Sequence, residues 1–203
     1  MDKLSSVAEA EHPYVSRGGV KLAHALDAFA INPAGRVCAD LGCSTGGFTD
    51  VLLRRGAARV YAIDTGYGVL DWRLRNDPRV VVMERTNAMH VVLPEPVSLV
   101  SIDAGWTRQA VLLPAVRRML MQDGDVVTLV KPHYEADPRP LRRTRGVLPE
   151  QRLEEVLVCV RKEIVEGGFQ IVGETPSPIR GSSGKTARGN IEVLMHLRVA
   201  SND

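Results

Sequence analysis

The sequence predicts an α/β fold in which helices cover both faces of a mostly parallel sheet. Short apolar strand patterns alternate along the chain with stretches of helical periodicity, which is the order that builds a parallel sheet. The last two strand patterns are joined by a loop rich in Gly, Ser and Pro, which predicts an antiparallel pair at the end. A chain of 203 residues with 44% hydrophobic content is long enough to bury one such core.

Apolar spacing defines each expected element. Seven segments have the short pattern of strands: 37–41, 59–63, 80–83, 98–102, 126–130, 169–175 and 191–199. Four segments have helical spacing: 16–30, 47–55, 108–120 and 149–166. Pro33-Ala34-Gly35 and Gly167-Gly168 stop the first and last helices, and Asp123-Gly124-Asp125 predicts a turn before the fifth strand.

Composition excludes several classes of protein. No apolar run approaches the roughly 18 residues that span a bilayer. The start of the chain is polar, so we expect a cytoplasmic protein with a tail over 1–13 and one domain over 14–199. Three cysteines without a CxxC pair suggest buried side chains and no disulfide framework, and scattered histidines predict no metal site.

The segment 39–50, Ala-Asp-Leu-Gly-Cys-Ser-Thr-Gly-Gly-Phe-Thr-Asp, is the most informative part of the chain. Its glycines follow a strand pattern and precede a helix, so the backbone can approach a ligand closely. It has neither the Lys-Ser/Thr end of a Walker loop nor the GxGxxG fingerprint. Asp40 would repel phosphate but would tolerate a sulfonium, which favours S-adenosylmethionine over a phosphate ligand. A plain strand-turn-helix is the alternative.

A second acidic residue supports a nucleoside cofactor. Asp64 ends the second strand pattern about 20 residues past the glycine loop, where a carboxylate accepts hydrogen bonds from ribose hydroxyls. Gly66 and Tyr67 follow in a turn that would lie beside adenosine, although an ordinary surface turn explains them equally well.

The chain resembles the TlyA (hemolysin A-like) branch of the FtsJ-type ribosomal RNA 2′-O-methyltransferases over residues 14 to 198. Five phrases in order carry the resemblance: YVSRGGVKL from Tyr14, DLGCSTGGFTD from Asp40, ERTN from Glu84, LVKP from Leu129 and GNIE from Gly189. It implies a Rossmann-like class I methyltransferase fold, with an antiparallel last strand in a seven-stranded sheet. It also implies S-adenosylmethionine as cofactor, with these candidate contacts: Asp40, Gly42, Ser44, Thr45, Gly46, Gly47, Phe48, Asp64, Gly66, Tyr67, Asn87 and Asp103.

A catalytic tetrad of two lysines and two acids is implied by the same resemblance, at Lys21, Asp103, Lys131 and Glu192. Asp103 and Lys131 follow the fourth and fifth strand patterns, at the edge where open α/β sheets bind ligands. We expect a ribose 2′-hydroxyl to attack the methyl carbon of the sulfonium. Lys131 would stabilise the developing alkoxide, Asp103 would orient Lys131, and Lys21 and Glu192 would fix the ribose.

Basic clusters favour RNA as the partner, although the net charge is only +2. We expect these side chains to bind the substrate: Arg17, Trp106, Arg142, Arg143, Arg145, Arg180, Lys185 and Arg188. Solvated basic loops are the plain alternative for the clusters.

Two departures from the family leave other functions open. Relatives usually carry an N-terminal S4 RNA-binding module, whereas a short polar tail precedes Tyr14 here. After Asp103, relatives carry a Val-Ser-Phe-like run where this chain has Ala104-Gly105-Trp106. Methylation of a small hydroxylated metabolite is therefore the runner-up function. A non-catalytic cofactor-binding or membrane-active protein is a third hypothesis, but no amphipathic or spanning segment supports it.

Overall fold

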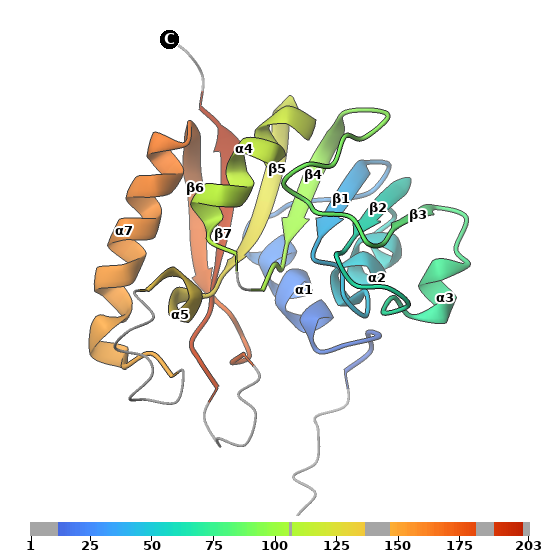
Figure 1. Cartoon of the computed structure of the whole chain (residues 1–203). Coiled ribbons are helices and arrows are strands. Elements are labelled where there is room, and N and C mark those ends of the chain that lie inside the picture. The colour runs from blue at the N-terminus through green and yellow to red at the C-terminus, as the bar shows by residue number, and fades with distance from the viewer. Residues whose placement is uncertain (1–11, 106, 137–146, 182–188, 201–203) are drawn as a thin grey trace, which may run out of the picture.

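One seven-stranded sheet forms the centre of the protein, in the order β3-β2-β1-β4-β5-β7-β6. The computed structural model describes residues 12–105, 107–136, 147–181 and 189–200 (Figure 1). The strands are β1 (Val37–Leu41), β2 (Arg59–Ile63), β3 (Val80–Met83), β4 (Val97–Ile102), β5 (Leu120–Val130), β6 (Phe169–Pro176) and β7 (Val193–Val199). Only β7 runs against its neighbours, β5 and β6, so the predicted mostly parallel sheet with an antiparallel last strand is confirmed.

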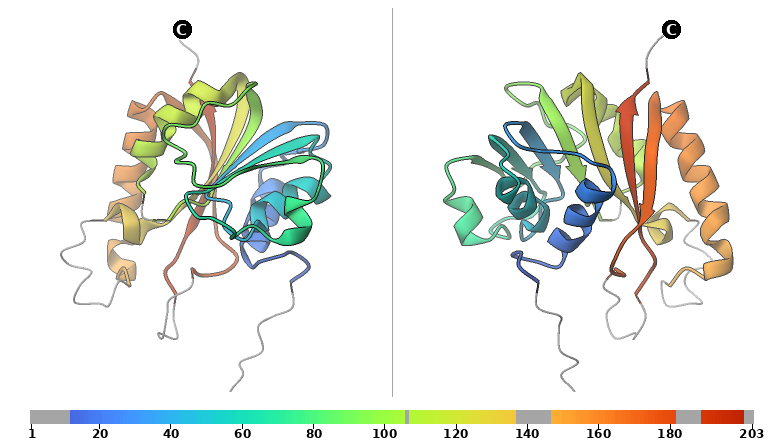
Figure 2. Two further views of the ribbon diagram at one scale, coloured as in Figure 1. Left: turned by 45° about the vertical axis from the view of Figure 1, so that its right-hand side comes forward. Right: turned by 180° about the vertical axis from the view of Figure 1, so that it is seen from behind.

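Helices pack on both faces of this sheet, as predicted. They are α1 (Gly18–Ala28), α2 (Gly47–Arg54), α3 (Trp72–Arg75), α4 (Gln109–Met119), α5 (Pro132–Glu135) and α7 (Leu153–Glu166), with a 3-10 turn at Glu150–Arg152. Figures 1 and 2 show α1 and α2 against one face and α4 and α7 against the other. The one-turn helices α3 and α5 were not predicted, because four residues are too few to show a helical period.

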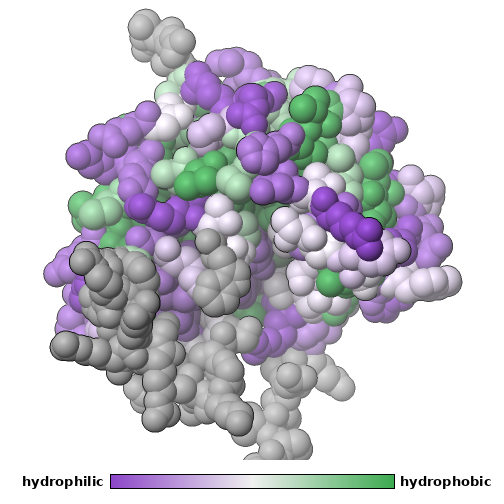
Figure 3. All heavy atoms as spheres, viewed as in Figure 1, coloured by the Kyte–Doolittle hydropathy of each residue, from purple (hydrophilic) through white to green (hydrophobic). Residues whose placement is uncertain are grey.

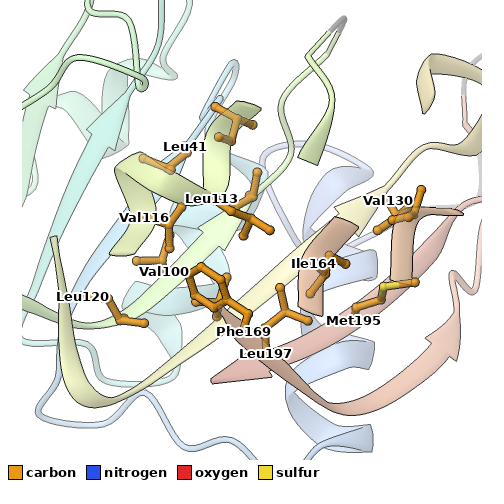
Figure 4. Packing of buried hydrophobic residues seen from close by; sticks show 14 of the residues in the cluster. Leu41, Val100, Leu113, Val116, Leu120, Val130, Ile164, Phe169, Met195 and Leu197 are labelled. Carbon is orange, nitrogen blue, oxygen red and sulfur yellow. The ribbon is translucent and has the colours of Figure 1, made fainter. Parts of the chain in front are cut away.

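Side chains of a buried parallel strand alternate between two apolar layers, and β1 shows this directly. Cys38 packs with residues of α1 and α2, whereas Ala39 and Leu41 pack in the layer of α4 and α7. Figure 4 shows that second layer, where Leu113 and Val116 meet side chains from the sheet. With both faces covered, polar function is confined to the ends of the strands.

β5 covers Leu120–Val130, so it begins six residues before the predicted 126–130. Its pairing with β4 is irregular at the predicted turn Asp123-Gly124-Asp125, because Leu120 pairs with Val97 and the next pair is Asp125 with Leu99. Asp125 is buried inside the strand because its carboxylate has close partners: the guanidinium groups of Arg36 at 2.8 Å and Arg198 at 2.9 Å, and the ring of His196 at 2.8 Å. These pairings hold the pKa of Asp125 well below its usual range despite burial. A residue that reads as a turn former is therefore the centre of a buried charge network.

The surface carries no extended apolar region on the face shown in Figure 3, where hydrophilic side chains surround small apolar patches. Cys159 is exposed, which contradicts its expected burial, whereas Cys38 and Cys43 are buried as predicted. Within the described ranges, no helix combines the length and apolar composition that crossing a bilayer requires.

We predict that Gly47→Ala destabilises the protein, because α2 begins in direct contact with α1. A Cβ at Gly47 would collide with the Ser16 hydroxyl and lie 2.8 Å from the Gly19 nitrogen. We expect the free energy of unfolding in urea to fall by about 1–3 kcal/mol. Gly105→Ala is the control, since a Cβ there meets no atom within 4 Å. Equal effects of the two substitutions would contradict the close α1–α2 packing.

Candidate functional site

The carboxyl ends of the parallel strands share one edge of the sheet, toward the bottom of Figure 1. Functional candidates stand just after four of these strands: Gly42 after β1, Asp64 after β2, Asp103 after β4 and Lys131 after β5. Because β7 runs in the opposite direction, its beginning lies at the same edge, where Val193 pairs with Val130. The reversed strand therefore brings Glu192 beside Lys131.

The four tetrad candidates form two ion pairs at this edge. Lys21 of α1 pairs with Glu192, and their side chains are only 10% and 3% exposed. Lys131 Nζ lies 2.6 Å from Asp103 Oδ1, close enough for an ion pair but without the geometry of a regular hydrogen bond. All four residues line one cavity of about 460 Å³, which we call the Lys21 cavity. The structure therefore brings together the residues that the resemblance implied.

A second cavity of about 420 Å³, which we call the Asp64 cavity, adjoins the first. Asp64, Thr86 and Asn87 contribute polar groups to it, and Ile63, Met89 and Leu112 contribute apolar surface. The two cavities share four lining residues: Gly42, Ser44, Asp103 and Lys131. The Asp103–Lys131 pair thus stands on the boundary between two adjoining ligand-sized spaces.

The glycine-rich loop forms part of that boundary. Gly42 adopts a φ of 81°, and a Cβ there would lie 2.9 Å from the Asp103 carbonyl oxygen, so only glycine fits. Ser44 has a φ of 49°, an uncommon value for a residue with a side chain, and its N–H donates to Asp64 Oδ2 at 2.8 Å. Asp64 Oδ1 accepts from the Gly66 N–H at 2.7 Å. Asp64 therefore fixes the loop while it lines a cavity.

Asp40 lies beneath the loop and lines neither cavity. Its side chain is fully buried and accepts hydrogen bonds from Thr49 at 2.7 Å and Ser101 at 3.1 Å. Burial raises the pKa of Asp40 to about 7, although the two hydroxyl donors lower it. We infer that Asp40 supports the loop from below, rather than facing a cationic ligand as the sequence suggested.

The twelve predicted cofactor contacts divide into two groups. Eight predicted cofactor residues line at least one cavity: Gly42, Ser44, Thr45, Gly47, Phe48, Asp64, Asn87 and Asp103. Four do not: Asp40, Gly46, Gly66 and Tyr67. Gly46 instead packs against Leu70 and Leu74, and Tyr67 is 70% exposed with the Arg85 guanidinium 4.1 Å from its ring centre.

Among the predicted substrate residues, exposed Arg17 lines the Lys21 cavity. Arg180 does not, and its guanidinium pairs with Glu150 at 3.0 Å. The others lie outside the described residues: Trp106, Arg142, Arg143, Arg145, Lys185 and Arg188. Their roles stay predictions.

Sequence reasoning missed His133 and Tyr134, which also line the Lys21 cavity. Their ring centres lie 4.1 Å apart, with the two ring planes tilted by 46°. Burial and the ammonium groups of Lys131 and Lys21 lower the pKa of His133 to about 4, so its ring is neutral at pH 7. Their position directly after Lys131-Pro132 could have indicated that they lie at the site. They were missed because a single helical turn has no periodicity to reveal it. Within the described ranges, no group of three or more His, Cys, Asp or Glu residues could hold a metal ion.

Comparison with known proteins shows the family of this chain. The family model described as FtsJ-like methyltransferase matches residues 14–187. The 16S/23S rRNA (cytidine-2'-O)-methyltransferase TlyA of Mycobacterium tuberculosis is 46% identical over 98% of this chain and 74% of its own length. The structure titled "Putative hemolysin from Streptococcus thermophilus" has a TM-score of 0.87 and 39% identity, covering 95% of this chain and 69% of that one.

More distant structures define the fold. An S-adenosylmethionine dependent methyltransferase from Mesorhizobium loti has a TM-score of 0.61 at 18% identity, over 86% of this chain and 96% of that one. The fold is thus that of the class I methyltransferases. Within that class, the chain belongs to the FtsJ-like methyltransferase family, in the TlyA or hemolysin A-like branch.

The buried Asp40 predicts a pH-dependent stability. Its pKa is raised from 3.8 to about 7 on folding, so the folded protein binds this proton more tightly than the unfolded chain. Stability should therefore fall as pH rises between about 4 and 7, by about 1.4 kcal/mol per pH unit relative to Asp40→Asn. Urea unfolding of both proteins at several pH values measures the difference. A difference that does not vary with pH would contradict the buried, proton-binding Asp40.

Proposed function

We propose that this protein transfers a methyl group from S-adenosylmethionine to a ribose 2′-hydroxyl of ribosomal RNA. The observation that carries the proposal is the boundary shared by the two cavities, where Asp103 and Lys131 face both. A methyl transfer needs the donor and the acceptor on opposite sides of such a boundary. Membership of the FtsJ-like methyltransferase family and the rRNA (cytidine-2'-O)-methyltransferase named for the Mycobacterium tuberculosis relative support the same reaction.

The Asp64 cavity fits the methyl donor. Each oxygen of the Asp64 carboxylate accepts one backbone N–H and keeps capacity for ribose hydroxyls. The Asn87 amide offers both donor and acceptor groups, and Ile63, Met89 and Leu112 offer apolar surface for a flat base. Gly42 and Ser44 would lie beside the amino-acid portion. When bound, S-adenosylmethionine supplies a methyl group on a positively charged sulfur.

The Lys21 cavity fits the acceptor sugar. Two ammonium groups and two carboxylates balance in charge, and His133 adds none because its ring is neutral. The balanced charges of these four residues suit a neutral ribose better than a phosphate. Exposed Arg17 adds a positive charge at the cavity lining, where it can meet the backbone phosphates of RNA.

The two ion pairs in this cavity suggest a role for each of the four residues. A ribose hydroxyl loses its proton reluctantly at neutral pH, so a cation beside the developing alkoxide accelerates the reaction. Lys131 is that cation. Asp103 orients it, with Oδ1 2.6 Å from Lys131 Nζ. The buried Lys21–Glu192 pair holds the acceptor ribose.

The test is transfer of labelled methyl groups to ribosomal RNA and ribosomal subunits, followed by nuclease digestion and mass spectrometry of the nucleosides. A 2′-O-methylated nucleoside is the expected product, with a rate that falls steeply as salt rises. A parallel assay offers small hydroxylated acceptors in place of RNA, because the cavity of about 460 Å³ has room for them as well. Transfer to those acceptors alone would replace the RNA proposal with the runner-up function.

Lys131→Ala should abolish transfer while leaving affinity for S-adenosylmethionine within about threefold, because its proposed role is in the reaction and not in binding the donor. Isothermal calorimetry measures the affinity, and the labelled-methyl assay measures turnover. Lys162→Ala, at a side chain 74% exposed on α7, is the matched control and should change neither. Loss of donor binding in Lys131→Ala would contradict this division of labour.

A further inference from the structure

Lys131 stands at the beginning of α5, which is a single helical turn over Pro132–Glu135. A helix this short has too few internal hydrogen bonds to hold itself in place. Its internal backbone bonds include Tyr134 N to Lys131 O at 2.8 Å and Ala136 N to Pro132 O at 3.0 Å. The position of Lys131 therefore depends on what fixes the other end of the turn.

Glu135 fixes that end. Its side chain is 2% exposed, and its Oε1 accepts from the backbone N–H of Gln109, the first residue of α4, at 2.9 Å. Its Oε2 lies 3.4 Å from Arg108 Nε. Arg108 also pairs with Glu163 of α7, with Nη2 of the guanidinium 2.5 Å from Glu163 Oε1. We call Glu135, Arg108, Gln109 and Glu163 the Glu135 clamp.

The clamp also reaches the sheet. The Gln109 side-chain oxygen accepts from the Thr128 hydroxyl of β5 at 2.7 Å, inside the protein. A buried carboxylate costs free energy, and burial raises the pKa of Glu135. An apolar side chain would fill the same space at less cost. The contacts of the Glu135 carboxylate with Gln109 and Arg108 therefore indicate that it holds α5 in position.

Two loops are thereby joined at two points. The loop from β4 to α4 carries Asp103 at one end and Arg108 at the other. The segment after β5 carries Lys131 at one end and Glu135 at the other. The Asp103–Lys131 pair joins the two segments at the cavities, and the Glu135 clamp joins them again at Arg108 and Glu135.

We propose that Glu135 is a positioning residue that sets Lys131 against Asp103 through α5 and the start of α4. The role in turnover rests on the proposed methyl transfer, whereas the role in geometry does not. Glu135 reaches the reacting groups only through the backbone of α5, so it touches neither substrate nor donor.

The test compares Glu135→Ala with Glu135→Gln. Glutamine keeps an oxygen for the Gln109 N–H but places an NH2 group where Arg108 Nε meets an acceptor oxygen, so it gives up the Arg108 contact while Arg108 retains Glu163. We expect kcat to fall about 10–100-fold in Glu135→Ala and to recover to within about threefold of wild type in Glu135→Gln. The KM for the acceptor and the affinity for the donor should change by less than about threefold in both variants.

Arg161→Ala is the control, because its ion pairs with Glu154 and Glu174 also involve α7 but lie outside the clamp. It should leave kcat unchanged. If Glu135→Ala does not fold, Arg108→Ala carries the test, with an expected loss in kcat of about 3–10-fold. An unchanged kcat per folded molecule in the variant tested would overturn the proposal, as would equal losses in Glu135→Ala and Glu135→Gln.

A crystal structure of Glu135→Ala supplies a readout that does not depend on activity. We expect Lys131 Nζ to move away from Asp103 Oδ1, beyond the 2.6 Å of the intact protein. An unmoved pair would overturn the proposal even if activity fell. If the wild type methylates no acceptor, the proposed function fails, and the structural readout still decides whether Glu135 positions Lys131.

Discussion

The buried ion pair between Lys21 and Glu192 is the constraint on which the site depends. It joins residues 171 positions apart in the sequence and ties α1 to the beginning of β7. Neither charge is stable in the interior alone, and removing one partner of a buried pair typically costs about 3–5 kcal/mol. Replacing both by apolar groups would often cost little, so the pair is better explained by the cavity it lines than by stability.

The sheet explains how such distant residues meet. Parallel strands deliver Gly42, Asp64, Asp103 and Lys131 to one edge, and the reversed β7 delivers Glu192 to the same edge. Apolar layers on both faces hold the strands in register, so the polar groups at the edge need only short loops. Each of those loops has its own support: Asp40 lies below the glycine loop, and the Glu135 clamp lies behind α5.

The sequence predicted the elements that have a period and missed those that lack one. All seven strands and the four long helices are found, because buried faces leave an apolar pattern. Most ends differ by a few residues, and β5 begins six residues before the predicted 126–130. The charge network of Asp125 was not predicted, because Arg36 and Arg198 come from distant segments that no local pattern reveals. Spacing placed Asp64 at a cavity, but the tetrad came from the family resemblance. His133, Tyr134 and Glu135 were missed because one helical turn leaves no signature.

The most direct test of the account is a crystal structure with S-adenosylhomocysteine, the product form of the methyl donor. We expect its ribose against Asp64 and Asn87, and its sulfur at the boundary beside Asp103 and Lys131. A nucleoside seated in the Lys21 cavity, or a sulfur remote from the Asp103–Lys131 pair, would contradict the assignment of donor and acceptor to the two cavities.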